Sequence, residues 1–140
     1  MTKLEALKKI LEKNGGLLRP SDVVEEARDS KSPLHSSFCW DDTEAARLFR
    51  LDQAQRLIRS FRFKVDDGEK SVDVPVFVNI SIDRVGAKDA NPYRLTEDVA
   101  RTPNLLEIVE KDALDQLRGI RERYGHLKRL KDIWDAIDNS

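Results

Sequence analysis

The sequence has little of what catalytic, metal-binding or membrane-spanning proteins need. A single cysteine, Cys39, cannot form a disulfide within the chain, which suits a reducing cytoplasm. No apolar run approaches the roughly 20 residues that span a bilayer, and the N-terminus lacks the apolar core of a signal peptide. The glycines form no phosphate loop, since Gly15-Gly16 is not followed by Gly-Lys-Ser/Thr, and no G-x-S-x-G, H-E-x-x-H or calcium-loop pattern occurs. These absences predict a soluble cytoplasmic protein with no cofactor, no metal, no membrane span and no catalytic residues.

Charge is abundant but balanced. Lys, Arg, Asp and Glu make up 36% of the 140 residues, and the formal net charge is −1. Two segments are basic, because positions 45–64 and positions 118–131 each hold six basic residues and one acid. Only such local patches can argue for nucleic acid, since the total charge argues neither way.

Three helices are expected in the first 60 residues. Thr-x-x-Glu at 2–5 is a capping box that opens the first helix, and Asn-Gly-Gly at 14–16 ends it. Pro20 suits the first turn of a second, shorter helix. Asp41 as N-cap, with Glu44 three residues on, is a second capping box and predicts a third helix that continues to about residue 60.

The apolar period then changes from helical to alternating. Asp67-Gly68 lies between two alternating runs, which predicts a β-hairpin whose loop has two or more residues. Pro75 inside the second run predicts an edge position or a bulge there. The segment 93–95 is a candidate third strand.

The last element is predicted to be long and helical. Thr102-Pro103 is a good helix start, and an apolar seam with a spacing of seven follows. The seam, a candidate oligomerisation element, consists of Leu106, Ala113, Ile120, Leu127 and Trp134. An unbroken helix from 103 to 138 would be about 50 Å long. Gly125 could instead end one helix and start a turn into a second, which would give a helical hairpin.

The predicted fold class is therefore α+β, with a three-helix unit, a β-hairpin and a long C-terminal helix or helical hairpin. We expect two parts, residues 1–96 and residues 97–140. Three helices followed by a hairpin resemble the order of a winged helix-turn-helix domain. The roughly twelve residues between the second and third helices depart from it, because a helix-turn-helix uses a short turn.

One stretch of motifs resembles a family of small proteins encoded by bacteriophages and prophages. The likeness covers residues 19–60, with a looser likeness around Tyr124 and Trp134. Its motifs are Asp-Val-Val-Glu-x-Ala-Arg-Asp at 22–29, Ser-Pro-Leu-His at 32–35, Phe-x-Trp-Asp-Asp at 38–42, Ala-Ala at 45–46, Arg50 and Leu-Ile-Arg at 57–59. The resemblance implies a phage or prophage setting and no particular activity. Cys39 stands where that family's pattern predicts an acid.

The densest group of reactive side chains is His35, Cys39, Asp41 and Asp42. One histidine and one cysteine four apart, with no second pair, fall short of a metal site. Cys39 could pair with His35 or His126 as a nucleophile, but no cationic surroundings mark it as a thiolate. We expect this loop to pack onto the helices, with the two aspartates favouring the positive end of the helix dipole.

Two functions from different classes remain. In the first, the chain is a phage-type accessory protein that binds DNA without catalysis, as an oligomer, in a regulatory or packaging role. Arginine suits this role because its planar fork bonds two phosphate oxygens at once. The phosphate-binding candidates are Arg56, Arg59, Arg62, Lys64, Arg118, Arg121 and Arg129. In the second, the chain is a structural or adaptor protein that binds another phage or host protein through the C-terminal seam, and the basic patches are solvated surface.

Overall fold

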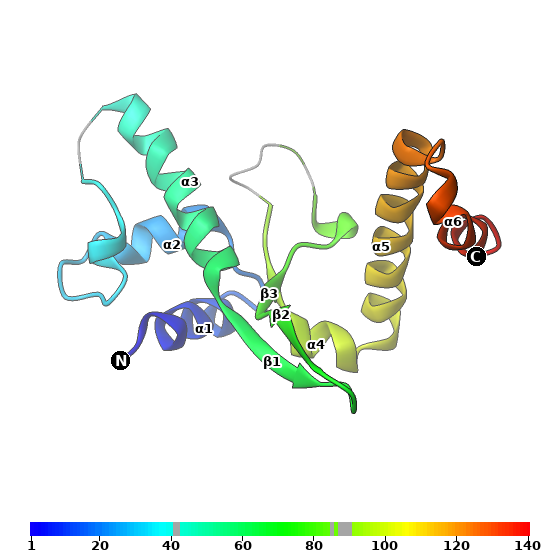
Figure 1. Ribbon diagram of the computed structural model, residues 1–140. Coiled ribbons are helices and arrows are strands. Elements are labelled where there is room, and N and C mark those ends of the chain that lie inside the picture. Colours follow the sequence, from blue (N-terminus) through cyan, green and yellow to red (C-terminus); the bar gives the residue numbers. More distant parts are fainter. Residues whose placement is uncertain (41–42, 85, 87–90) are drawn as a thin grey trace.

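The computed structural model describes residues 1–40, 43–84, 86 and 91–140, and it confirms the predicted α+β class and element order (Figure 1). The described helices are α1 (Lys3–Lys13), α2 (Pro20–Ala27), α3 (Glu44–Ser60), α4 (Thr96–Arg101), α5 (Pro103–Tyr124) and α6 (Lys131–Asp138). The strands are β1 (Arg62–Asp66), β2 (Ser71–Pro75), β3 (Phe77–Val78) and β4 (Arg94–Leu95). Short 3₁₀ turns are η1 (His35–Ser37), η2 (Ser81–Asp83) and η4 (Lys128–Leu130).

The predicted start and stop signals of the first two helices are confirmed. The Thr2 hydroxyl accepts a hydrogen bond from the Glu5 backbone N–H at 3.1 Å, and the Glu5 carboxylate accepts one from the Thr2 N–H at 3.2 Å. After α1, the chain turns through Gly15 and Gly16. Their positive φ angles of 68° and 87° are unfavourable for residues other than glycine. α2 then begins at Pro20.

Helix α3 ends at Ser60 as predicted, but it begins differently. Its N-cap is Thr43, whose hydroxyl accepts from the Ala46 N–H at 3.1 Å, so the prediction of Asp41 as N-cap is wrong. Asp41 itself lies outside the described residues. The inward side of α3 carries Arg50, while the neighbouring Phe49 stays exposed.

The main core lies between α1, α2, α3 and the strands. Its buried members are spread over residues 6–77: Ala6, Leu7, Ile10, Leu11, Leu18, Val23, Val24, Ala27, Leu34, Phe38, Leu51, Ala54, Ile58, Val76 and Phe77. Tyr93 and Leu95 pack against this core from the later part of the chain. The core is thus built by the N-terminal unit, and α5 and α6 contribute nothing to it.

The hairpin is confirmed, with a loop of four residues. β1 and β2 pair antiparallel, with Phe63 opposite Val74 and Val65 opposite Val72. The Asp67 carboxylate accepts hydrogen bonds from two backbone N–H groups of the loop, which hold its pKa below its ordinary value.

Pro75 ends β2, and the chain then changes partner. β3 pairs antiparallel with β4, which confirms the predicted third strand at Arg94-Leu95. Tyr93 forms a bridge with Leu18, so this small sheet ties the later chain to the segment between α1 and α2.

An ion pair fixes η2 within the N-terminal part of the chain, and a hydrogen bond from η2 joins that part to α5. The guanidinium of Arg94 bonds both oxygens of the buried Asp83 carboxylate, at 2.6 and 2.9 Å, and this raises the pKa of Arg94. The Ser81 N–H donates to a carboxylate oxygen of Asp112 on α5 at 2.8 Å. Burial raises the pKa of Asp112, but the hydrogen bonds from Ser81 together with the nearby charges of Arg84 and Lys111 outweigh it, and the net shift is downward.

The C-terminal segment is a helical hairpin, so the alternative of one unbroken helix from 103 to 138 is wrong. α5 ends at Tyr124, and the chain turns through Gly125 and η4 into α6 (Figure 1). A Cβ at position 125 would clash with the guanidinium of Arg121, so the absence of a side chain lets Arg121 fold over the turn. The turn also provides the Leu127 carbonyl, which accepts a hydrogen bond from the Trp134 indole N–H.

Candidate interaction surfaces

The first predicted phosphate-binding group lies on α3 and the hairpin, where its members are exposed. The structure pairs two of them with acids: Arg56 with Asp52 at 2.8 Å, and Lys64 with Asp73 at 3.3 Å. Arg59 donates to the side chain of Gln55, and Arg62 is exposed at the start of β1. Exposed ion pairs are worth at most about 1 kcal/mol, so a phosphate could displace the acids. The acids nevertheless reduce the positive potential of this surface.

The hairpin itself is not a basic wing. Positions 62–75 hold three basic residues and four acids, a net charge of −1. This net negative charge would repel the phosphate backbone of DNA. In a winged-helix arrangement the hairpin is instead expected to contact phosphates favourably.

The second predicted phosphate-binding group has a different role. Arg121 forms an ion pair with Asp138 at 3.3 Å and lies 5.9 Å from the ring centre of Trp134. Arg118 pairs with Asp115 and donates to the Ser140 carbonyl. Both arginines therefore fasten α6 and the C-terminus to α5. Arg129 is exposed on η4, and this group lies well apart from α3 and the hairpin (Figure 1).

The α5–α6 hairpin is closed by a small core of its own. Trp134 and Ile137 are buried, and the Trp134 indole N–H donates to the Leu127 carbonyl at 3.3 Å. This explains why the predicted seam is not continuous. Trp134 points into the hairpin, and Leu127 lies in the turn after α5, so neither continues the line of Leu106, Ala113 and Ile120.

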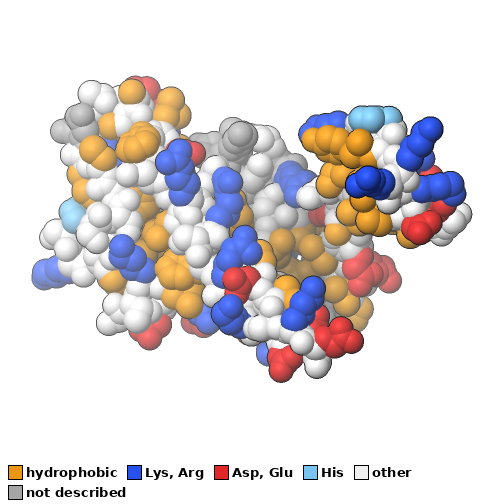
Figure 2. Space-filling model, viewed as in Figure 1, with side chains coloured by type: hydrophobic (Ala, Val, Ile, Leu, Met, Phe, Trp, Pro, Cys, Tyr) orange, Lys and Arg blue, Asp and Glu red, His pale blue; other side chains and the backbone are white. Residues whose placement is uncertain are grey.

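A group of exposed apolar side chains lies on the α5–α6 arm. None of the 22 residues of α5 is buried. Leu117, Ile120, Tyr124, Leu127 and Ile133 are between 41 and 54% exposed, and Figure 2 shows hydrophobic side chains gathered along the upper part of the α5–α6 arm. Exposed apolar patches are typical of interaction surfaces, which makes this one a candidate.

Leu117 and Tyr124 were missed by the seam of sevens. They lie four residues after Ala113 and Ile120, and residues three and four apart share one side of a helix. We call the set Leu106, Ala113, Leu117, Ile120 and Tyr124 the α5 face. The signal was present in the sequence, because these spacings of seven, four, three and four are those of the two apolar positions of a heptad.

The His35–Trp40 loop is a clamp between α2 and α3. The two rings stack with centroids 5.0 Å apart and 9° between their planes. The Trp40 indole N–H donates to the His35 carbonyl, and the His35 ring bonds the Ala27 carbonyl at 2.8 Å. Arg28 and Arg50 lie 5.6 and 5.4 Å from the Trp40 ring centre. Parts of the Ser-Pro-Leu-His and Phe-x-Trp-Asp-Asp motifs, which carry the resemblance to phage-encoded proteins, thus lie in a packed loop.

No metal or nucleophile geometry emerges at this loop in the residues that the structure describes. Among them, no three His, Cys, Asp or Glu side chains are grouped closely enough to hold a metal ion. Asp41 and Asp42, two of the four candidates, lie outside those residues. Cys39 is exposed, and its backbone is held by Gln53 and Arg50.

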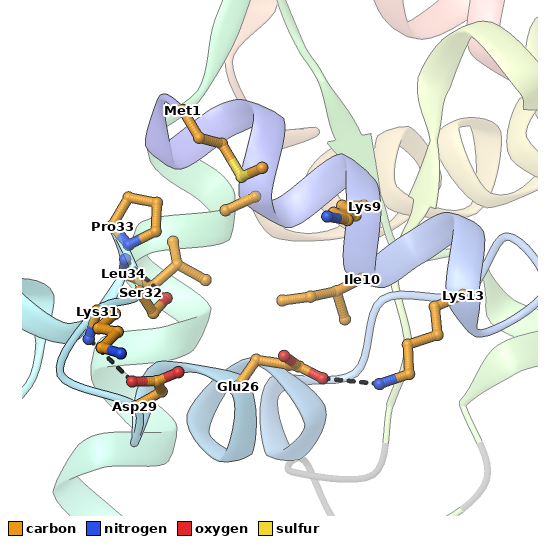
Figure 3. A pocket seen from close by; sticks show the side chains of 11 residues that line it. Met1, Lys9, Ile10, Lys13, Glu26, Asp29, Lys31, Ser32, Pro33 and Leu34 are labelled. Carbon is orange, nitrogen blue, oxygen red and sulfur yellow. Dashed lines mark hydrogen bonds and ion pairs between the residues drawn. The ribbon is translucent and has the colours of Figure 1, made fainter.

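A hollow of about 300 Å³ lies between α1 and the chain from α2 to η1 (Figure 3). Its floor includes Ile10 and Leu34, and lysines 9, 13 and 31 line it. Glu26 pairs with Lys13 across it at 3.0 Å. None of the predicted site residues lines this hollow.

The described geometry defines the class of the protein: an α+β chain whose N-terminal core carries a helical-hairpin arm with an exposed apolar face. No described helix is long and apolar enough to cross a membrane. Comparison of the chain with protein-family models, with curated proteins and with solved structures finds no match. The resemblance to phage-encoded proteins therefore stays a prediction.

Proposed function

We propose that the chain is a non-enzymatic assembly or adaptor protein that binds protein through the α5 face. The observation that carries the proposal is that an amphipathic helix of 22 residues has no buried residue. Helices in proteins gain most of their stability from packing an apolar side, so the side of α5 that carries Leu117, Ile120 and Tyr124 is suited to a partner.

The joint between the two parts supports this role. The Ser81–Asp112 hydrogen bond anchors the first half of α5 to η2, which Arg94 in turn holds through Asp83, while the exposed apolar residues lie in the second half of α5 and beyond. The α5–α6 arm is therefore attached through the first half of α5, and its other end exposes the apolar residues. Following the resemblance, we place this function in a phage or prophage setting in the bacterial cytoplasm, with another phage or host protein among the candidate partners.

Site-specific photo-cross-linking in the cells that contain the protein tests the proposal. A photoreactive amino acid replaces Ile120 in one variant and Leu48, a somewhat more exposed residue on α3, in the control. We expect a discrete adduct of defined mass from position 120 and none from position 48. Equal labelling from both positions, or no adduct from position 120, would refute the proposal.

DNA binding is the second candidate, favoured by three exposed arginines on consecutive elements. Arg56, Arg59 and Arg62 run from the end of α3 into β1. With Lys64 they could neutralise four phosphates, and four contacts predict that affinity falls about 150-fold between 50 and 200 mM salt.

Fluorescence anisotropy with a labelled duplex measures this slope. Arg56→Glu with Arg59→Glu should abolish the binding, whereas Lys8→Glu with Lys9→Glu, the same charge change on exposed α1 positions, should leave most of it. Absence of binding at 50 mM salt to duplex and to single strand would exclude the DNA candidate.

A further inference from the structure

We infer that the partner of the α5 face is a second copy of the same chain, bound with its α5 antiparallel to the first. The inference rests on the proposed function, since it names the occupant of that face. It starts from the charge distribution along α5. Residues 103–116 contain four acids and one base, and residues 117–124 contain three bases and one acid.

This polarity makes the helix complementary to itself in one direction only. Two parallel copies would bring acidic half to acidic half and basic half to basic half, which is repulsive. Two antiparallel copies bring each acidic half beside the basic half of the other chain. The face can therefore close on itself by a two-fold axis, the commonest symmetry of protein dimers.

The apolar residues fit the same arrangement. An antiparallel pair centred near residue 115 sets Tyr124 level with Leu106 of the second copy, and Leu117 level with Ala113. A bulky side chain then faces a small or unlike one at these two levels, and the small Ala113 allows the helices a close approach. The position of α5 suits this arrangement, because the helix runs clear of α1, α2 and α3 (Figure 1).

A polar contact is available in the same register, where Glu110 takes the heptad position seven residues before Leu117. Glu110 lies within one residue of the level of Arg121 of the second copy, and both lie on the same side of the α5 face. In an antiparallel pair, matching sides of the two helices meet. Arg121 already holds Asp138 at 3.3 Å, so Glu110 would extend an existing ion pair rather than replace it.

Sedimentation velocity of the full chain tests self-association. We expect a concentration-dependent dimer, and Leu117→Asp should raise its dissociation constant by at least about 100-fold, because a two-fold interface buries the new charge twice. Leu48→Asp, at a position 56% exposed on α3, is the matched control and should leave the dimer unchanged. A wild-type chain that is monomeric up to about 100 μM would overturn the inference.

Disulfide cross-linking tests the orientation, in a Cys39→Ser background that removes the exposed native thiol. In the antiparallel register, the two copies of position 124 lie about 27 Å apart along the axis, too far for a disulfide. We expect a mixture of Leu106→Cys and Tyr124→Cys chains to cross-link, and Tyr124→Cys alone to remain unlinked. Efficient cross-linking of Tyr124→Cys alone would show parallel helices and overturn the inference.

The two proposals can fail separately. A monomer in sedimentation, together with a photo-adduct at position 120 whose mass differs from twice the chain, refutes the second copy and leaves the protein-binding function standing. A monomer without a specific adduct at position 120 refutes both.

Discussion

Replacing Trp134 with alanine should release α6 from α5 while the N-terminal core stays folded. Trp134 is 5% exposed, its indole donates to Leu127, and Arg121 lies over its ring. Removing a buried tryptophan side chain costs about 3–5 kcal/mol. Helices need about 12–15 residues to persist alone, and α6 has eight, so its order depends on this packing. The free energy lost on removing the indole should therefore exceed the free energy that holds α6 against α5.

Amide hydrogen exchange followed by mass spectrometry measures this release. In Trp134→Ala, we expect positions 131–138 to exchange at rates typical of unfolded chain, with α1 and α3 unchanged. Ile133→Ala, at a position 54% exposed on the same helix, should change stability by no more than about 0.5 kcal/mol. Retained protection of α6, or loss of protection in α1 and α3 together with α6, would refute the reasoning. It would mean that the arm is not a separate packing unit.

Three further substitutions test the contacts that hold the fold. Trp40→Ala removes a ring stacked on His35, and we expect a loss of about 2–4 kcal/mol in urea unfolding; Trp40→Phe should retain part of it, and equal losses would contradict the stacking argument. Asp83→Asn leaves the half-buried guanidinium of Arg94 without its carboxylate, and a loss of about 3 kcal/mol is expected; no measurable loss would show that the pair is not structural. The pKa of Asp112 is lowered in the fold, so its contribution is present at neutral pH and is lost as the pH falls through that lowered pKa. The stability gap between wild type and Asp112→Asn should therefore be open at pH 7 and narrow below about pH 4, and a gap that is constant with pH would contradict this assignment.

Local signals in the sequence predicted the elements well. The capping box at Thr2, Pro20 at the start of α2, Asp67-Gly68 in the hairpin loop and Thr102-Pro103 before α5 all mark boundaries that the structure has. Such signals act within a few residues, so the chain reveals them without knowledge of its tertiary contacts.

Features that depend on distant contacts were not predicted. α4 was missed because its six residues carry a single buried side chain, Val99, too few to show a helical period. The course of the chain after Gly125 was left open, because the helical period continues into α6, and only the packing of Trp134 on α5 decides that the chain folds back.

In the candidate surfaces, too, local signals predict some features, and distant contacts decide the others. The exposure of Arg56, Arg59 and Lys64 follows from the helical and alternating periods. The acid partners of Arg56 and Lys64, across a helical turn and across the strand pair, do not follow from a count of basic residues. Arg118 and Arg121 were expected to face outward, and they fasten the hairpin because α6 returns beside them. Leu117 and Tyr124 could have been found by following both apolar positions of the heptad.

The division of the chain into residues 1–96 and 97–140 remains a prediction that the hydrogen-exchange experiment tests. The division lies one residue after the change from β4 to α4, which falls between Leu95 and Thr96. The Ser81–Asp112 hydrogen bond would then link two separately packed parts.

Covalent footprinting with a carbene reagent tests the central claim, that the α5 face is covered by protein when the chain works. The reagent labels exposed apolar side chains, and the protein in an extract of its own cells is compared with the purified chain at high dilution. The account predicts that labelling of residues 113–124 falls several-fold in the extract, while labelling of Leu48 and Phe49 stays the same. Equal labelling of residues 113–124 in the two samples would contradict it.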